Sequence, residues 1–168
     1  MKNQTKVIAK KGVQELFITR EFEAPRGLVF KAISDPELLV RWLGGCDMTM
    51  HIDHLDNRTG GSYRFLHCSA SGHEYGFNGV IHDVTAPERM IRTFEFEGLP
   101  ERGHVSLETA TFEALPPKVS QGPARTKLTI QSVFKSVADR DAMVASGMEH
   151  GVVESHVRLD ELFEKLLK

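Results

Sequence analysis

Histidines and carboxylates gather at two places in the sequence where they could bind a metal ion or transfer protons. His51, Asp53 and His54 are close neighbours, and His150 and Glu154 are about one helical turn apart. Alternation in a strand directs His51 and Asp53 to one face and His54 to the other, so the three do not converge as metal ligands must. The spacing of His150 and Glu154 favours an ion pair on a helix flank. We therefore expect neither a metal site nor a catalytic residue at these places.

Arg20 occupies an apolar position of a predicted strand. It follows Leu16 and Ile18 and precedes Phe22 in the same alternation. A buried guanidinium needs an acceptor. The acceptor is either an internal carboxylate or carbonyl, or the acidic head group of a ligand, which suits the planar, bidentate guanidinium. A shift of one residue in strand register would move Arg20 to the other face.

Gly147 and Gly151 interrupt a run, 137–167, that otherwise predicts one long amphipathic helix. An interior glycine costs a helix about 1 kcal/mol relative to alanine, so two of them require a reason. At helical spacing they share a stripe with Val144, Met148, Ser155, Leu159, Leu162 and Leu166. The absent side chains allow either close packing against a sheet or a space beside the helix. The Ser155 hydroxyl either bonds its own helix backbone or faces that space.

The elements that must position these residues follow a simple order along the chain. One strand is followed by two short helices, about six consecutive strands and the long final helix. The predicted strands cover residues 16–22, 48–52, 62–68, 74–85, 90–96, 105–114 and 126–134. Adjacent strands in sequence imply antiparallel meanders and an α+β fold. We expect one domain over residues 14–168, with a bent sheet of about seven strands covered by the final helix, after a flexible tail over residues 1–13.

Composition excludes several classes of protein. The 168 residues carry a formal net charge of −2, which gives no basic footprint for nucleic acid. No apolar run reaches membrane-spanning length, and the start of the chain lacks a secretory signal. We therefore expect a cytoplasmic protein without stable membrane insertion. In that compartment Cys46 and Cys68 are expected to be reduced thiols rather than a disulfide.

Several short motifs, taken in order, resemble those of the START-like (SRPBCC) superfamily. The strings are Ile18–Pro25 with Leu28–Ala32, Asp35-Pro36-Glu37, Arg41-Trp42, Gly60–Arg64, Gly79, Pro87-Glu88-Arg89, Thr93, Gly147–Gly151 and Arg158-Leu159. More narrowly, the chain is similar to the family of homologues of the activator of heat-shock-protein-90 ATPase. The resemblance covers residues 14–167 and implies the helix-grip fold, a bent antiparallel sheet gripping a C-terminal helix around a hydrophobic cavity.

The resemblance also implies a choice of functions. Family members bind lipids, sterols and polyketides, some cyclise polyketides, and the eponymous co-chaperone stimulates a chaperone ATPase. Our first hypothesis is a binder of a small hydrophobic or amphipathic molecule, without catalysis, cofactor or metal. The alternatives are a polyketide-cyclase-like enzyme using the same cavity, or a protein-interaction module that contacts a chaperone. Either a monomer or a homodimer fits the sequence.

The expected ligand site lies between the final helix and the sheet. Such pockets are largely apolar with a few placed polar groups. The polar candidates are Arg20 first, then Tyr63, Tyr75, His150 and Ser155. The remaining predicted lining is apolar or glycine: Trp42, Phe65, Phe77, Phe94, Val144, Gly147, Met148 and Gly151. The aromatic residues among these could equally fill a solid core.

Overall fold

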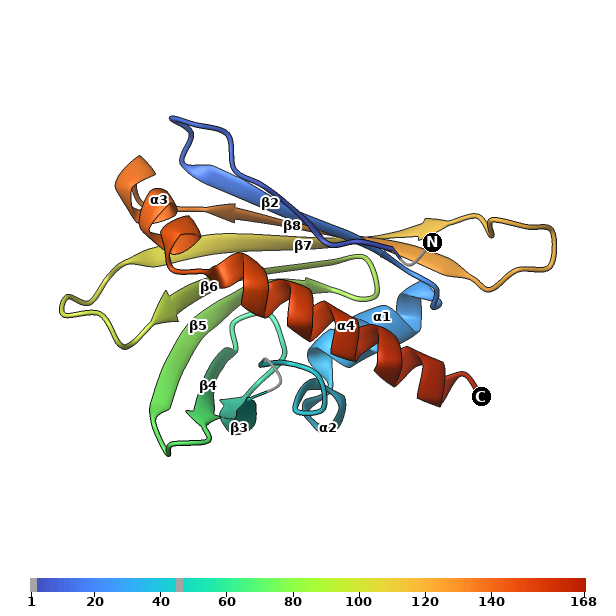
Figure 1. Cartoon of the computed structure of the whole chain (residues 1–168), viewed down its shortest axis with the longest axis horizontal. Coiled ribbons are helices and arrows are strands. Elements are labelled where there is room, and N and C mark those ends of the chain that lie inside the picture. The colour runs from blue at the N-terminus through green and yellow to red at the C-terminus, as the bar shows by residue number, and fades with distance from the viewer. Residues whose placement is uncertain (1–2, 45–46) are drawn as a thin grey trace.

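One bent antiparallel sheet forms the body of the protein, with helices on its inner side (Figure 1). The computed structural model describes residues 3–44 and 47–168. The strands are β1 (Lys6–Ile8), β2 (Glu15–Phe22), β3 (Met48–Leu55), β4 (Ser62–Ser69), β5 (Glu74–Thr85), β6 (Arg89–Phe96), β7 (Val105–Leu115) and β8 (Arg125–Val133). The helices are α1 (Arg26–Ser34), α2 (Pro36–Leu39), α3 (Val137–Ala145) and α4 (Met148–Leu166). The predicted α+β architecture is confirmed.

The sheet contains eight strands among the described residues, where the sequence predicted about seven. Their order is β1-β2-β8-β7-β6-β5-β4-β3. The additional strand, β1, pairs with β2 and lies within the segment predicted to be a flexible tail. A strand of three residues is too short to show a recognisable alternation of apolar and polar residues. Strand β1 forms because it pairs with β2.

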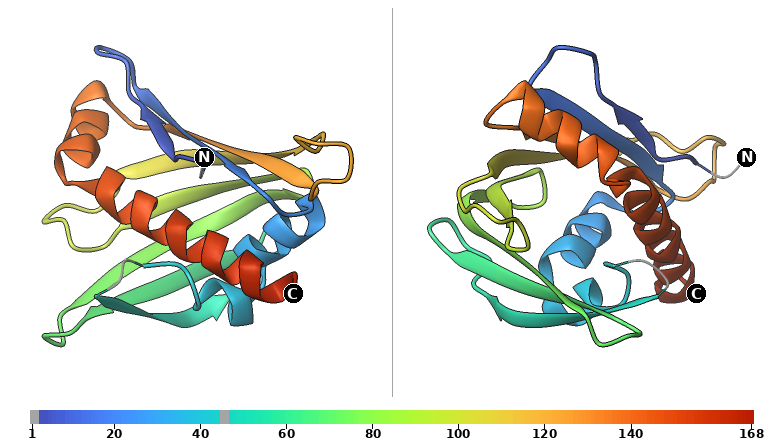
Figure 2. Two further views of the ribbon diagram at one scale, coloured as in Figure 1. Left: turned by 45° about the vertical axis from the view of Figure 1, so that its right-hand side comes forward. Right: turned by 60° about the vertical axis from the view of Figure 1, so that its left-hand side comes forward.

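Sheet curvature brings α4 across the inner face, while α1 and α2 cover one end (Figure 2). Alternation in β2 sends Leu16, Ile18, Arg20 and Phe22 to this face, and all four are buried. The register then fixes the inner face of the neighbouring strands. Ile18, for example, opposes Ile130 on β8, which opposes Ala110 on β7.

The apolar core is divided into two clusters. The larger joins α1, α2 and the C-terminal half of α4 to the sheet, with Phe22, Leu159 and Phe163 among its members. The smaller lies under the N-terminal half of α4, where Met148 and Val152 pack against buried side chains that include Leu16. Helix α4 is therefore held near both ends by apolar burial.

The predicted single helix over residues 137–167 is wrong, because the chain turns at Gly147. Helix α3 ends at Ala145 and α4 begins at Met148, with Gly147 between them at a φ of 83°. This left-handed conformation is strained for residues with a Cβ but accessible to glycine. Helical spacing alone does not distinguish a glycine inside a helix from one that ends it.

Two of the helices begin beside a residue whose side chain caps the first turn. The Asp35 carboxylate accepts a hydrogen bond from the Glu37 amide at 2.9 Å, with Pro36 at the first helical position. The Ser136 hydroxyl accepts from the Asp139 amide at 3.0 Å at the start of α3.

Candidate functional site

A cluster of half-buried rings lies on the inner face of β4, β5 and β6. Its members, here called the aromatic cluster, are His67, Tyr75, Phe77, Phe94 and Phe96. The Phe77 ring stacks on Phe94 with centroids 5.4 Å apart and contacts Phe96 at 5.2 Å and His67 at 4.9 Å. None of the five belongs to either apolar core cluster of the described residues. These rings therefore form a surface that the chain itself does not fully cover.

A row of polar side chains crosses the same face beside these rings. Arg92 on β6, Glu108 on β7 and Ser132 on β8 are successive cross-strand partners, here called the polar row. Arg92 Nε donates to Glu108 Oε2 at 3.4 Å, and the guanidinium lies over the Tyr63 ring, 4.8 Å from its centroid. The two charged side chains are 23% and 19% exposed, so both remain accessible to solvent.

Three hydroxyl groups, on this face and on α4 above it, have no hydrogen-bond partner in the described part of the protein. Ser106 and Ser132 on the sheet and Ser155 on α4 are buried residues. Their hydroxyl oxygens have no hydrogen-bond partner among residues 3–44 and 47–168, yet none of them is sealed from solvent. Water or a ligand must therefore be able to reach them, because a buried hydroxyl is normally hydrogen-bonded.

Helix α4 leaves open space beside Gly151. A Cβ added at Gly151 would meet no atom within 4 Å, so close packing against the sheet, one of the two accounts of this glycine, is wrong. Seven residues on, Arg158 lies on the same side of the helix and donates to the carbonyl oxygens of Gly44 at 3.0 Å and Arg41 at 3.2 Å. Gly44 in turn lies beside the His67 ring. These contacts connect this flank of α4 to the segment beside the aromatic cluster.

Two titratable groups beside the charged pair, Tyr63 and His67, are held neutral. Burial raises the pKa of the Tyr63 hydroxyl to about 12, although Arg92 opposes the shift. The hydroxyl donates to the Thr93 carbonyl at 2.7 Å, so Tyr63 is a core residue that supports Arg92. Burial also lowers the pKa of His67, which keeps its imidazole uncharged within the aromatic cluster.

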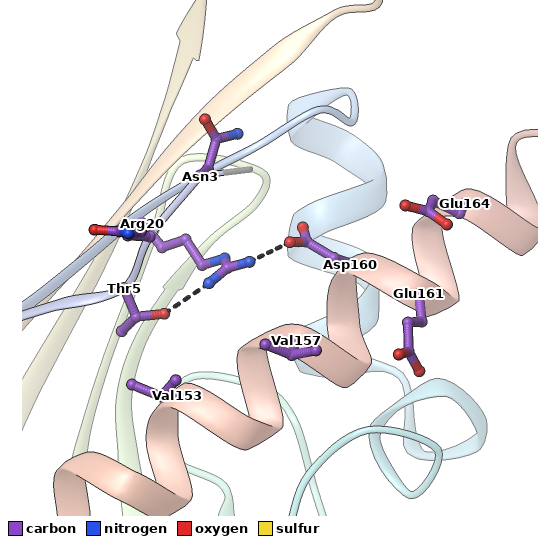
Figure 3. A pocket seen from close by; sticks show the side chains of 9 residues that line it. Asn3, Thr5, Arg20, Val153, Val157, Asp160, Glu161 and Glu164 are labelled. Atoms are coloured by element: carbon purple, nitrogen blue, oxygen red, sulfur yellow. Dashed lines mark hydrogen bonds and ion pairs between the residues drawn. The ribbon is translucent and has the colours of Figure 1, made fainter. Parts of the chain in front are cut away.

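Arg20 lies on the other side of α4, at a separate groove (Figure 3). Its guanidinium forms an ion pair with Asp160 of α4 and donates to the Thr5 hydroxyl at 3.0 Å. Thr5 lies 2.9 Å from Nδ1 of His156, whose pKa is lowered to about 3 by burial and by Arg20. Of the two acceptors expected for Arg20, the structure supplies the internal carboxylate.

The groove beside this network has a volume of about 290 Å³. Its walls come from the N-terminal segment and the outer side of α4, including Val153, Val157 and Glu161 (Figure 3). Arg20 is only 4% exposed and is engaged by Asp160. The groove is thus a different location from the aromatic cluster, and Arg20 does not contribute to the inner-face site.

Besides His150, twelve residues are predicted to bind ligand, and five of them lie on the inner face or on the part of α4 above it. Tyr75, Phe77 and Phe94 lie in the aromatic cluster, and Gly151 and Ser155 lie on α4 above the inner face. The others serve different purposes: Trp42, Tyr63 and Phe65 are core, Met148 packs in the smaller cluster, Gly147 ends a helix, Val144 is exposed on α3, and Arg20 faces the separate groove. The break at Gly147 explains Val144, because α3 does not continue the α4 stripe.

The other histidines and the cysteines considered as candidate functional residues do not gather into a site within the described residues. His150 pairs with Glu154 at 3.2 Å on an exposed helix flank, as predicted. His54 bonds Ser62 at 3.0 Å. No group of three metal-ligating side chains occurs within the described ranges. Cys68 is a free thiol, and the expectation for Cys46 lies outside the described residues.

Sequence reasoning missed the charged pair at the centre of the site. Arg92 follows Met90 and precedes Phe94 in one alternation, and Glu108 precedes Ala110 and Phe112 in another. Each is therefore a charged residue at an inward position, the same signal that singled out Arg20. Their pairing depends on the register of β6 against β7, which the separate strand patterns do not determine.

Similarity to solved structures supports the fold. A protein of Rhodobacter sphaeroides superposes with a TM-score of 0.82 at 23% identity, covering 96% of this chain and 99% of its own. One from Chromobacterium violaceum gives 0.74 at 25% identity, with 90% and 97% covered. The AHSA1 protein of Silicibacter pomeroyi gives 0.67 at 20% identity, with 88% and 95% covered. No curated protein matches the chain.

The family model described as Activator of Hsp90 ATPase homolog 1-like protein matches residues 23–164. This stretch runs from the end of β2 to the last turns of α4 and includes the aromatic cluster, the polar row and Gly151. Among the described residues, no helix is both long enough and apolar enough to cross a membrane. The chain belongs to the Activator of Hsp90 ATPase homolog 1-like family.

Proposed function

We propose that this protein binds a small hydrophobic or amphipathic molecule on the inner face of the sheet, under α4, without catalysing a reaction. The observation that carries the proposal is the aromatic cluster, whose rings are half-buried and belong to neither core cluster. Burying such rings against an apolar ligand is favourable by about 25 cal/mol per Å² of apolar surface removed from water. The unpartnered hydroxyls beside the rings are typical of a pocket that is apolar with a few polar groups.

The position of Gly151 supports the same proposal. A side chain added there would enter open space rather than collide with the sheet. The space lies on the side of α4 that Arg158 shares, towards Gly44 and His67. A ligand on the aromatic cluster would therefore lie below this part of the helix.

The test is a fluorescence titration with N-phenyl-1-naphthylamine, a neutral apolar probe that brightens when it leaves water. We expect saturable binding by the wild type and roughly tenfold weaker binding by Gly151→Leu, because leucine would occupy the space. Gly27→Leu is the matched control, since Gly27 is exposed in helix α1 and an added Cβ there would also meet no atom within 4 Å.

Two results would contradict the proposal. One is the absence of saturable binding, combined with no co-purified small molecule in a native mass spectrum. The other is equal weakening by Gly151→Leu and Gly27→Leu, which would place the probe elsewhere. Circular dichroism of each variant checks that the fold is retained.

A further inference from the structure

The polar row has hydrogen-bonding capacity that the protein does not use. Within the described residues, the hydrogen bond from Arg92 Nε to Glu108 Oε2 is the one bond that either side chain makes. The terminal nitrogens of Arg92 and the second oxygen of Glu108 are therefore unbonded, and none of them is sealed from solvent. Ser132 is the next residue along the row, and its hydroxyl is likewise unbonded and not sealed from solvent.

The arrangement holds these groups in place. The Tyr63 ring covers one face of the Arg92 guanidinium, 4.8 Å from the ring centroid. Burial works to lower the pKa of Arg92, but Tyr63 and Glu108 together raise it above its ordinary value, so the side chain stays charged. A donor and an acceptor thus stand side by side, next to the aromatic cluster.

Charge determines which head group this pair suits. The pair is neutral overall, so a carboxylate approaching Arg92 is repelled by Glu108 at nearly the same distance. Such a ligand would lose its hydration without a net electrostatic gain. In the same way, an ammonium group approaching Glu108 is repelled by the positive charge of Arg92. A neutral group with an acceptor beside a donor can bond both partners and loses far less hydration.

We infer that the polar row recognises a neutral head group with an acceptor next to a donor, of which a carboxamide is the simplest example, and discriminates against carboxylates and amines. The carbonyl oxygen of such a group accepts from the terminal nitrogens of Arg92, and its N–H donates to the second oxygen of Glu108. The apolar part of the molecule lies on the aromatic cluster. This inference rests on the proposed function.

Competition between matched ligands tests it. Decanamide, decanoate and decylamine share one alkyl chain and differ in the head group, and each is used to displace N-phenyl-1-naphthylamine at neutral pH. We expect decanamide to compete roughly tenfold better than the two charged ligands on the wild type. Glu108→Gln should shift the preference towards decanoate, because Arg92 then acts unopposed. Arg92→Gln should shift it towards decylamine.

The matched control is Glu113→Gln, because Glu113 is an exposed residue on the outer face of the same strand, β7. It should leave the order of the three ligands unchanged. Equal competition by all three on the wild type, or an order that neither inner-face variant alters, would overturn the inference while leaving the proposed function intact. Absence of probe binding would overturn both. The two inner-face variants are independent, so failure of one to fold leaves the other as the test.

Discussion

The hydroxyl of Thr5 lies 2.9 Å from Nδ1 of His156, linking the N-terminal segment to α4. Because Thr5 accepts a hydrogen bond from Arg20, its own proton can be donated to a neutral imidazole. The buried His156 is 4% exposed and its ring packs edge-on against Phe22, with centroids 5.6 Å apart. The network thus favours the uncharged histidine.

This histidine should make stability depend on pH. Burial, with a contribution from Arg20, lowers the pKa of His156 from 6.5 to about 3 in the folded protein. Since the unfolded chain binds the proton more readily, stability is lost as the pH falls below the unfolded pKa, and the loss continues down to the folded value. Between about pH 7.5 and about pH 5.5, His156 alone should lower the free energy of unfolding by about 1.4 kcal/mol.

Urea titrations across this pH range measure the effect. His156→Gln should flatten the slope of unfolding free energy against pH, and His150→Gln should not, because His150 is exposed on the helix flank. Identical slopes for wild type and His156→Gln would show that the imidazole is not held neutral by the fold.

The ion pair between Arg20 and Asp160 should matter for stability rather than for ligand binding. Asp160→Asn leaves a guanidinium that is 4% exposed without its anionic partner, and we expect a loss of about 2–3 kcal/mol in the free energy of unfolding. Adding Arg20→Met to that variant should recover part of the loss, as a double-mutant cycle would reveal.

Arg20→Met alone should leave the affinity for N-phenyl-1-naphthylamine unchanged. Arg20 faces the groove near the N-terminal segment, on the other side of α4 from the aromatic cluster. A large loss of probe affinity in a folded Arg20→Met protein would restore the ligand-anchor role that the sequence suggested for this residue.

Replacing Gly147 or Gly151 with alanine should change the free energy of unfolding in opposite directions. Gly147 has a φ of 83°, which strains a residue with a Cβ, so Gly147→Ala should lower the free energy of unfolding by about 1 kcal/mol. Gly151 is helical with open space around it, so Gly151→Ala should raise that free energy by about 0.5–1 kcal/mol. Denaturant unfolding of both variants measures these changes. If both variants gained stability, or both lost it, the different roles given to the two glycines would be contradicted.

Two phenylalanines on the inner face should differ in their structural importance. Phe112 is 3% exposed and packs against Phe30 in the larger core cluster, so Phe112→Ala should cost about 3–5 kcal/mol. Phe94 lies in the half-exposed aromatic cluster, so Phe94→Ala should cost less than half as much. If Phe94→Ala proved as destabilising as Phe112→Ala, the aromatic cluster would be core rather than a binding surface.

Features set by neighbouring residues were predictable from the sequence. The side chains of Asp35 and Ser136 each cap a helix by bonding a backbone amide no more than three residues further along the chain. Alternation likewise places Phe77 and Phe94 on one side of their strands. Local patterns also predicted the order of the elements, which the structure confirms apart from the additional strand β1 and the division of the last helix into α3 and α4.

Features set by pairing between distant segments were not predictable in the same way. Arg92 meets Glu108 only through the register of two strands, and Thr5 meets His156 only when the N-terminal segment lies beside α4. The apolar residues before and after Gly147 keep the same helical spacing, although the chain turns there in a left-handed conformation. The spacing therefore did not reveal that the helix is broken at this residue.

The division of the apolar core has a mechanical consequence. Helix α4 is anchored by Met148 and Val152 near its start and by His156, Leu159 and Phe163 further along. Gly151 lies on a different flank of the first half, where an added Cβ would meet no atom within 4 Å. If the proposed ligand lies beside Gly151, ligands of different bulk would leave these anchors in place, and selectivity would depend on the head group rather than on a close fit of shape.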